Sequence, residues 1–287
     1  MLKMGFALAL WAAGASAWAA DLKTRHQFAR LDGFRVHYQS VGSGRRAIVF
    51  LSGWGCDASL WRNQLPELVR CGRLLVLDLP GHGRSDKPEI AYTVGLFARA
   101  VNAVLDHAGV EKAVLVGHSM GGMVAYEFAR RHKDKALALI WVEGSFGLPV
   151  QVDEQLAEFS RRAKEFRAPD YKQKIDKFAE QLFSAETPAA VRREVIASIL
   201  ATPQHVLAGC QEGFADRAIF EPERLELPAF ALFARFWKPE RFTEIYKKYL
   251  PNLEIQYIDG CGHYPMLEKP EEVNQALISY LGRHPLK

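Results

Sequence analysis

The chain has 287 residues, of which 49% are hydrophobic and 24% are charged, and its formal net charge is +4. This composition is ordinary for a globular protein and excludes a disordered, collagenous or coiled-coil chain. Because the small net charge includes no basic run, we expect no nucleic acid among its partners.

The first 19 residues have the pattern of a secretory signal peptide. Lys3 gives a positive start, residues 5–16 form a short apolar stretch, and residues 15–17 and 17–19 are both small-x-small cleavage patterns. The stretch is short for a membrane span, and an uncleaved anchor is the alternative. We therefore expect an exported protein, periplasmic or secreted, without a stable membrane span after cleavage.

The next elements are predicted to form a hairpin and then a parallel sheet. Residues 27–30 and 34–39 flank Asp32-Gly33, the pair expected in a two-residue turn. Apolar runs without alternation then indicate strands covered on both faces. These runs are residues 47–51, 74–77, 114–116 and 137–142, and helical stretches are expected near residues 59–70, 94–108 and 120–131. The alternation of strands and helices predicts a doubly wound α/β domain.

A charge-rich insert interrupts this pattern. Over residues 146–220 the apolar runs stop, apolar side chains recur at helical spacing, and Lys and Glu fill the remaining positions. We predict a helical lid over residues 146–220 whose charges form a solvated outer face. It separates a first core part, residues 20–145, from a second, residues 221–287, which has strands at residues 229–233 and 253–258 and a final helix.

The four cysteines allow three disulfide pairings if the chain is exported. Cys56 and Cys261 are expected on loops at one edge of the sheet, Cys210 in the lid and Cys71 at the opposite edge. Cys71 is thus the least able to find a partner. Four free buried cysteines agree with the sequence as well as any bridge does.

A Gly-x-Ser-x-Gly pentad, residues 117–121, lies between an apolar run and a helical stretch. In the order strand, sharp turn, helix, this pentad is typical of a nucleophile elbow, with Ser119 at its tip. Such a tight turn leaves room only for glycine beside the serine, which gives Gly117 and Gly121 a steric reason to be small. Ser119 is the predicted nucleophile.

His263 is the predicted general base. A serine hydroxyl is a weak nucleophile until a base takes its proton. His263 follows the last predicted strand, in Gly260-Cys261-Gly262-His263, and thus stands on a loop at the same carboxyl edge as Ser119. It would then return the proton to the leaving group.

Four motifs together resemble the α/β-hydrolase superfamily, in particular its lidded esterases and cofactor-free haloperoxidase-like members. They are residues 51–55, 78–86, 117–121 and 260–263, in that order. The resemblance implies a mostly parallel eight-stranded sheet with helices on both faces, a helical lid after the sixth strand, and catalysis with no metal or organic cofactor. It also implies an oxyanion hole formed by the backbone N–H groups of Trp54 and Met120.

Two departures from the family pattern bear on the site. Ser52 stands where a histidine usually precedes the glycine, which is expected to alter loop packing more than catalysis. The larger departure follows Pro228, where the family's strand ends in the triad aspartate and this chain has Trp237, with no acid before Glu240.

Phe146 and Tyr264 could line a substrate pocket, although ordinary core packing is an equal interpretation for each.

We predict that Glu143 supplies the triad acid instead. Glu143 ends the strand after the one that carries Ser119, and adjacent parallel strands are only about 4.8 Å apart. Its carboxylate could accept the second ring N–H of His263. The placement resembles that of haloalkane dehalogenases that take their acid from this strand end, here 24 residues after Ser119. Two rivals remain: Glu143 caps the loop into the lid, or Glu240 recovers the usual site.

The sequence therefore predicts a serine hydrolase that cleaves a small or medium carboxylic ester through an acyl-enzyme with a Ser-His-Glu triad. Lactones, thioesters and carbon–carbon bond hydrolysis are alternatives with the same residues. A non-catalytic binding protein of the same fold is the alternative from another class.

Overall fold

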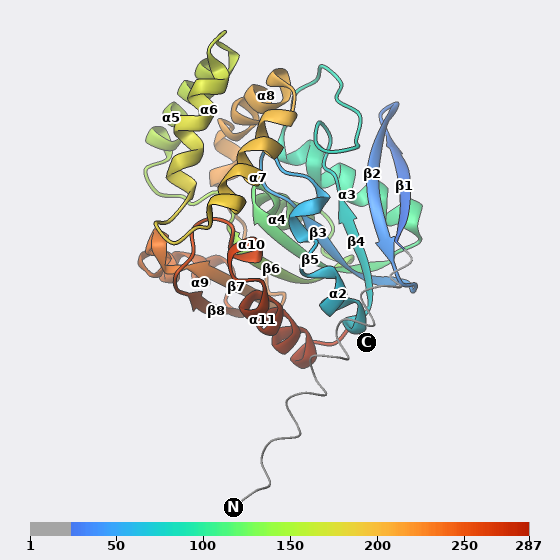
Figure 1. Ribbon diagram of the computed structural model, residues 1–287. Coiled ribbons are helices and arrows are strands. Elements are labelled where there is room, and N and C mark those ends of the chain that lie inside the picture. The colour runs from blue at the N-terminus through green and yellow to red at the C-terminus, as the bar shows by residue number, and fades with distance from the viewer. Residues whose placement is uncertain (1–23, 287) are drawn as a thin grey trace, which may run out of the picture.

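The computed structural model describes residues 24–286, and the predicted signal peptide, residues 1–19, lies outside that range. Within it an eight-stranded sheet has the order β1-β2-β4-β3-β5-β6-β7-β8 (Figure 1). Its strands are β1 (Arg25–Leu31), β2 (Phe34–Val41), β3 (Arg46–Leu51), β4 (Arg73–Leu77), β5 (Lys112–Ser119), β6 (Ala136–Gly144), β7 (Ala229–Ala234) and β8 (Leu253–Ile258). Only the pairings of β2 are antiparallel, which confirms the mostly parallel sheet.

The predicted hairpin is confirmed between β1 and β2. Leu31 pairs with Phe34, so Asp32 and Gly33 alone form the loop. Both have positive φ, 49° and 90°, as a two-residue turn between twisted strands requires.

Helices cover both faces of the sheet (Figure 1). α3 (Val94–Ala108) and α4 (Met120–Arg131) pack together on one face, and α11 (Pro270–Arg283) packs with α2 (Leu65–Leu68) on the other. The predicted helices at residues 94–108 and 120–131 are confirmed. α9 (Thr243–Tyr249) and α10 (Pro265–Glu268) are short helices of the second core part.

The helix expected over residues 59–70 is wrong. The chain there forms two 3₁₀ turns, Ala58–Trp61 and Val69–Cys71, on either side of the four-residue α2. Pro66 lies in the first turn of α2, and its missing N–H and fixed φ prevent a helix from running through it from the N-terminal side.

Residues 146–220, which we call the helical insert, lie between β6 and β7. Its helices are α5 (Val152–Arg167), α6 (Tyr171–Ala179), α7 (Ala189–Ala201) and α8 (Gln204–Phe214). They stand together at one side of the sheet (yellow-green to orange in Figure 1), and α5 packs against α8. Whether the insert acts as a lid, and the division of the chain into core and lid, stay predictions.

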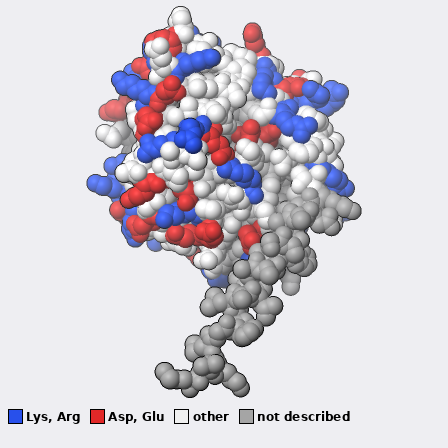
Figure 2. Space-filling view, in the orientation of Figure 1, with Lys and Arg blue, Asp and Glu red and all other residues white. Residues whose placement is uncertain are grey.

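Charged side chains of both signs are mixed on the surface. On the face seen in Figure 2, Lys and Arg side chains are interspersed with Asp and Glu. No helix within residues 24–286 is long and apolar enough to cross a membrane. All four cysteines are free; Cys56, Cys210 and Cys261 are buried and Cys71 is partly exposed.

Candidate active site

Ser119 occupies a strained turn between β5 and α4. Its φ of 51° and ψ of −119° lie in a region that side-chain-bearing residues rarely adopt. A Cβ on Gly117 would collide with the carbonyl oxygen of Gly121, and a Cβ on Gly121 would collide with that of Leu51 in β3. The elbow thus has the steric need for glycine that the sequence predicted.

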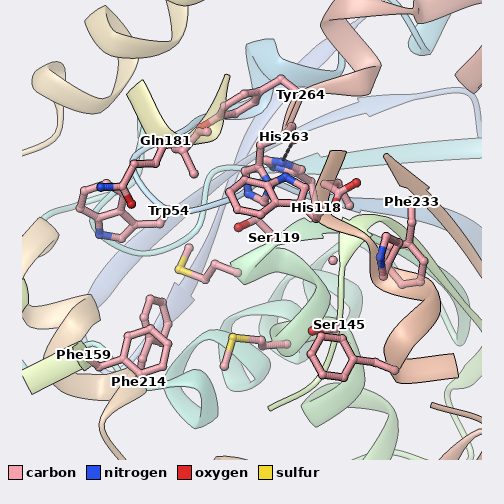
Figure 3. Close-up of a pocket in the computed structure, with 18 of the residues that line it drawn as sticks. Trp54, His118, Ser119, Ser145, Phe159, Gln181, Phe214, Phe233, His263 and Tyr264 are labelled. Atoms are coloured by element: carbon pink, nitrogen blue, oxygen red, sulfur yellow. Dashed lines mark hydrogen bonds between the residues drawn. The ribbon is translucent and has the colours of Figure 1, made fainter. Parts of the chain in front are cut away.

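The elbow opens into a cavity of about 450 Å³. Ser119 lies at its wall beside His263 and His118, and Tyr264 lies above these rings in the view of Figure 3. Parallel strands end at one edge of the sheet, and the loops after β5, β6, β7 and β8 all contribute lining residues. The structure therefore brings the predicted nucleophile and base into one cavity.

The loop that carries His263 is held through its backbone. The His263 N–H donates to the Leu182 carbonyl in the helical insert at 2.8 Å. Nε2 of His118 lies 2.8 Å from the His263 carbonyl oxygen, and because a carbonyl only accepts, this nitrogen must carry the proton. The Glu268 carboxylate accepts the N–H groups of Gly262 and Tyr264, the neighbours of His263, at 3.0 and 3.1 Å.

The His263 ring has an apolar setting. Its centroid lies 4.8 Å from that of His118 and 6.1 Å from that of Trp237, which meets it edge to face. Burial lowers the pKa of His263 to about 4. The ring is therefore neutral near pH 7, which is the form that a general base needs.

Glu143 lies at the wall of the same cavity. It ends β6 with a positive φ of 53°, and the next residue, Gly144, pairs with Ser119 across the two strands. The side chain is 8% exposed, and Oε2 accepts the Ala234 N–H from β7 at 2.5 Å. Burial raises the pKa of Glu143 to about 8, the Ala234 bond opposes the rise, and the charge of Glu268 adds to it.

The predicted bond between Glu143 and His263 is absent from the hydrogen bonds of residues 24–286. Among those residues, none donates to Oε1 of Glu143, so that oxygen remains available. Trp237, at the family's acid position, faces His263 with its ring, whereas Glu240 is exposed and does not line the cavity.

The loop after β3, which is predicted to supply an oxyanion-hole N–H from Trp54, lies against the elbow. A Cβ on Gly53 would sit 3.1 Å from Cβ of Ser119, so the following residue, Trp54, lies near the nucleophile. Met120 begins α4, and the first N–H groups of a helix have no partner within it. The Trp54 indole turns toward the insert, where Nε1 donates to the Leu207 carbonyl at 3.0 Å.

Of the two predicted pocket residues, Tyr264 lines the cavity and Phe146 does not. Phe146 is 2% exposed and packs against Tyr126, Trp141 and Tyr246, with ring centroids 5.0 to 5.8 Å apart. It faces the core because the chain turns away from the cavity after β6. The prediction for Phe146 is therefore corrected to core packing.

The sequence does not predict two polar residues of the cavity wall. Arg162 and Gln211 of the insert line the cavity, although the sequence favours a solvated face for the charges of the insert. The helical spacing of Phe159 and Phe166 could have drawn attention to this side of α5, which carries Arg162 as well. No group of three or more His, Cys, Asp or Glu side chains within residues 24–286 is arranged to hold a metal ion.

Comparison with known proteins agrees with this arrangement. The model of the alpha/beta hydrolase family matches residues 48–276. The chain is 28% identical over 274 residues to a 2-hydroxy-6-oxononadienedioate/2-hydroxy-6-oxononatrienedioate hydrolase of Paraburkholderia phymatum, with 87% of this chain and 91% of that protein covered. It is 29% identical over 262 residues to a pimeloyl-[acyl-carrier protein] methyl ester esterase of Edwardsiella ictaluri, with 85% and 96% covered.

A solved structure is similar over nearly its whole length. The thermophilic esterase of Thermogutta terrifontis superposes with a TM-score of 0.80 at 25% identity, and 91% of this chain and 99% of that one are covered.

Proposed function

The chain belongs to the alpha/beta hydrolase family, and we propose that it hydrolyses small or medium carboxylic esters through an acyl-enzyme formed on Ser119. One observation carries the proposal: the strained elbow presents Ser119 in the same cavity as His263, whose half-buried ring is neutral near pH 7. The esterase relatives and the esterase neighbour support the choice of an ester.

The reaction proceeds in two halves. His263 takes the proton of the Ser119 hydroxyl as the serine oxygen attacks the ester carbonyl. The oxyanion that forms accepts hydrogen bonds from the backbone N–H groups of Trp54 and Met120. His263 then protonates the departing alcohol as the carbon–oxygen bond breaks, which leaves the acyl group on Ser119. A water molecule, deprotonated by His263, releases the acid and restores the serine.

Glu143 is the third member of the proposed triad. It is supported by its place beside the strand that carries Ser119 and by the free Oε1 at the cavity wall. An ionised Glu143 would steady the imidazolium that forms on His263. Because the pKa of Glu143 is about 8, kcat/KM should rise with pH as this carboxyl ionises.

A carbon–carbon bond hydrolase is the second candidate, since one relative is named a 2-hydroxy-6-oxononadienedioate/2-hydroxy-6-oxononatrienedioate hydrolase and the substrate in that name contains no ester. The same Ser119 and His263 would serve a substrate in which carbon replaces the ester oxygen as the leaving atom. The two candidates share the nucleophile and differ only in the substrate accepted.

A substrate panel with an active-site probe tests the proposal. A fluorophosphonate should label Ser119 in the folded protein and leave Ser119→Ala unlabelled. Methyl and ethyl esters of graded acyl length should be hydrolysed faster than lactones, thioesters or vinylogous diketones. Labelling without ester hydrolysis, together with cleavage of the diketone, would move the assignment to the second candidate, and absence of labelling would remove both.

A further inference from the structure

One end of the cavity is built by the helical insert and is walled by aromatic rings. Phe159 and Phe214 lie on one side of Ser119, together with Trp54, and Phe233 lies on the other (Figure 3). The Phe159 and Phe214 rings meet at 5.5 Å, and the Trp54 ring meets that of Phe178 at 5.7 Å. An apolar chain that extends from Ser119 in this direction would pack against these rings.

The positively charged side chain of Arg162 lies within this aromatic end of the cavity. The Arg162 guanidinium stands over the rings of Phe159 and Phe178, with its central carbon 5.3 and 5.0 Å from their centroids. The side chain is only 21% exposed, and Nε donates to Glu158 at 2.8 Å. No residue within 24–286 accepts a hydrogen bond from its two terminal nitrogens, which therefore remain available for a ligand.

A buried amide lines the same cavity as this arginine. Gln211 on α8 lines the cavity, is 2% exposed, and has no hydrogen-bond partner at Oε1 among the described residues. A buried polar group without a partner costs free energy, so a ligand that pairs with it gains affinity. The oxygen and nitrogen of a glutamine amide exchange by a flip, so Gln211 can offer either an acceptor or a donor.

The packing of α5 against α8 brings the two polar groups together. Phe159 contacts Phe214, and further along α5 the Phe166 carbonyl accepts from Gln204 near the start of α8 at 3.0 Å. The helices are therefore antiparallel. Arg162 lies three residues after Phe159 on α5, and Gln211 lies three residues before Phe214 on α8, so both belong to the facing sides of the two helices and line the same cavity.

We propose that Arg162 and Gln211 bind a carboxylate at the far end of the substrate, so the preferred substrate is an ester with an apolar chain that ends in a carboxylate. The terminal nitrogens of Arg162 match the two oxygens of a carboxylate, and the Gln211 amide nitrogen adds a third donor. A neutral tail would leave these groups unpaired once water is excluded. This inference rests on the proposed ester hydrolysis.

Matched esters test the specificity. Monomethyl esters of linear dicarboxylic acids are compared with methyl esters of monocarboxylic acids of equal chain length, and kcat/KM is measured by pH-stat titration. The carboxylate series should be preferred at the chain length that spans the cavity. Arg162→Met, which keeps an apolar stem over the two rings, should lose roughly tenfold to hundredfold more kcat/KM on the carboxylate series than on the neutral one.

Arg161→Met is the control. Arg161 precedes Arg162 on α5, pairs with Glu158 and Glu165 and does not line the cavity, so this variant removes the same charge outside the site. It should keep the wild-type preference. The proposal would be overturned if Arg161→Met lost as much of the preference as Arg162→Met, or if Arg162→Met affected both series equally. A preference for hydroxyl tails that Gln211→Leu abolishes would also overturn it.

Binding to an inactive variant separates this inference from the proposed function. Ser119→Ala is titrated calorimetrically with a linear dicarboxylate monomethyl ester and with its neutral counterpart. The carboxylate ligand should bind more tightly, and the added Arg162→Met change should remove that difference. If no ester is hydrolysed by the wild type but this binding difference is found, the proposed function fails and the carboxylate site stands; equal binding of both ligands overturns the site.

Discussion

Replacement of Glu143 by glutamine should make the free energy of unfolding less dependent on pH between about 5 and 8. In the folded protein the Glu143 carboxyl is buried and its pKa is raised from an ordinary 4.5 to about 8. The folded state therefore binds a proton that the unfolded chain has already released, and stability falls as pH rises between these two values. Glutamine is a neutral mimic of the protonated acid and can still accept the Ala234 N–H.

The size of the effect follows from the two pKa values. One pH unit between them corresponds to about 1.36 kcal/mol, which gives an upper limit of about 4 kcal/mol lost by pH 8. Local relaxation and water penetration reduce such costs, so we expect a loss of about 2–4 kcal/mol in the wild type that is absent from Glu143→Gln.

Urea unfolding at a series of pH values from 5 to 8.5 measures this difference, since other titrating groups contribute equally to both proteins. In the same window kcat/KM of the wild type should rise toward a plateau as Glu143 ionises, while Glu143→Gln should stay low, by up to about 10⁴-fold. Parallel stability profiles for the two proteins would refute the buried neutral carboxyl. Near-wild-type activity of Glu143→Gln, with loss of activity in Glu240→Gln, would refute its catalytic role.

The remaining predictions concern the proposed nucleophile, the proposed base and its loop, and the predicted signal peptide. Ser119→Ala and His263→Ala should each reduce kcat by several orders of magnitude, and the double variant should be little worse, as steady-state kinetics would show; multiplied losses would contradict a shared step. Glu268→Ala should lower kcat by roughly tenfold to hundredfold with little change in KM, because the loop of His263 loses two backbone hydrogen bonds, whereas a change in KM alone would contradict this positioning role. We propose that the chain is exported, so intact-mass analysis from an exporting host should show cleavage after residue 17 or 19, and an uncleaved soluble product would contradict it.

The sequence predicted those features of the site that depend on local patterns. The elbow around Ser119 and its following helix α4 are fixed by steric exclusion at two glycines and by helical periodicity, both visible in a short window. His263 could be placed because it follows the last strand of a parallel sheet, whose strand ends meet at one edge.

What the sequence could not predict depends on side-chain direction and on partners far along the chain. Phe146 follows Glu143 by three residues, yet Phe146 points into the core whereas Glu143 lines the cavity. Arg162 is of a residue type common on the surface, and only the packing of α5 against α8 places it in the cavity.

The break in the helix at Pro66 is predictable from the sequence, because proline cannot continue a helix that runs into it.

The backbone contacts of His263 explain how Trp237 can stand at the family's acid position. A triad acid both stabilises the imidazolium and orients the ring. Here His118, Leu182 and Glu268 fix the loop through main-chain hydrogen bonds, and the edge-to-face contact with Trp237 limits rotation of the ring. The loop and the plane of the ring are thus held without an acid. In the proposed triad Glu143 would stabilise the charge of the imidazolium, an effect that depends on proximity. The free enzyme can therefore keep Glu143 bonded to Ala234.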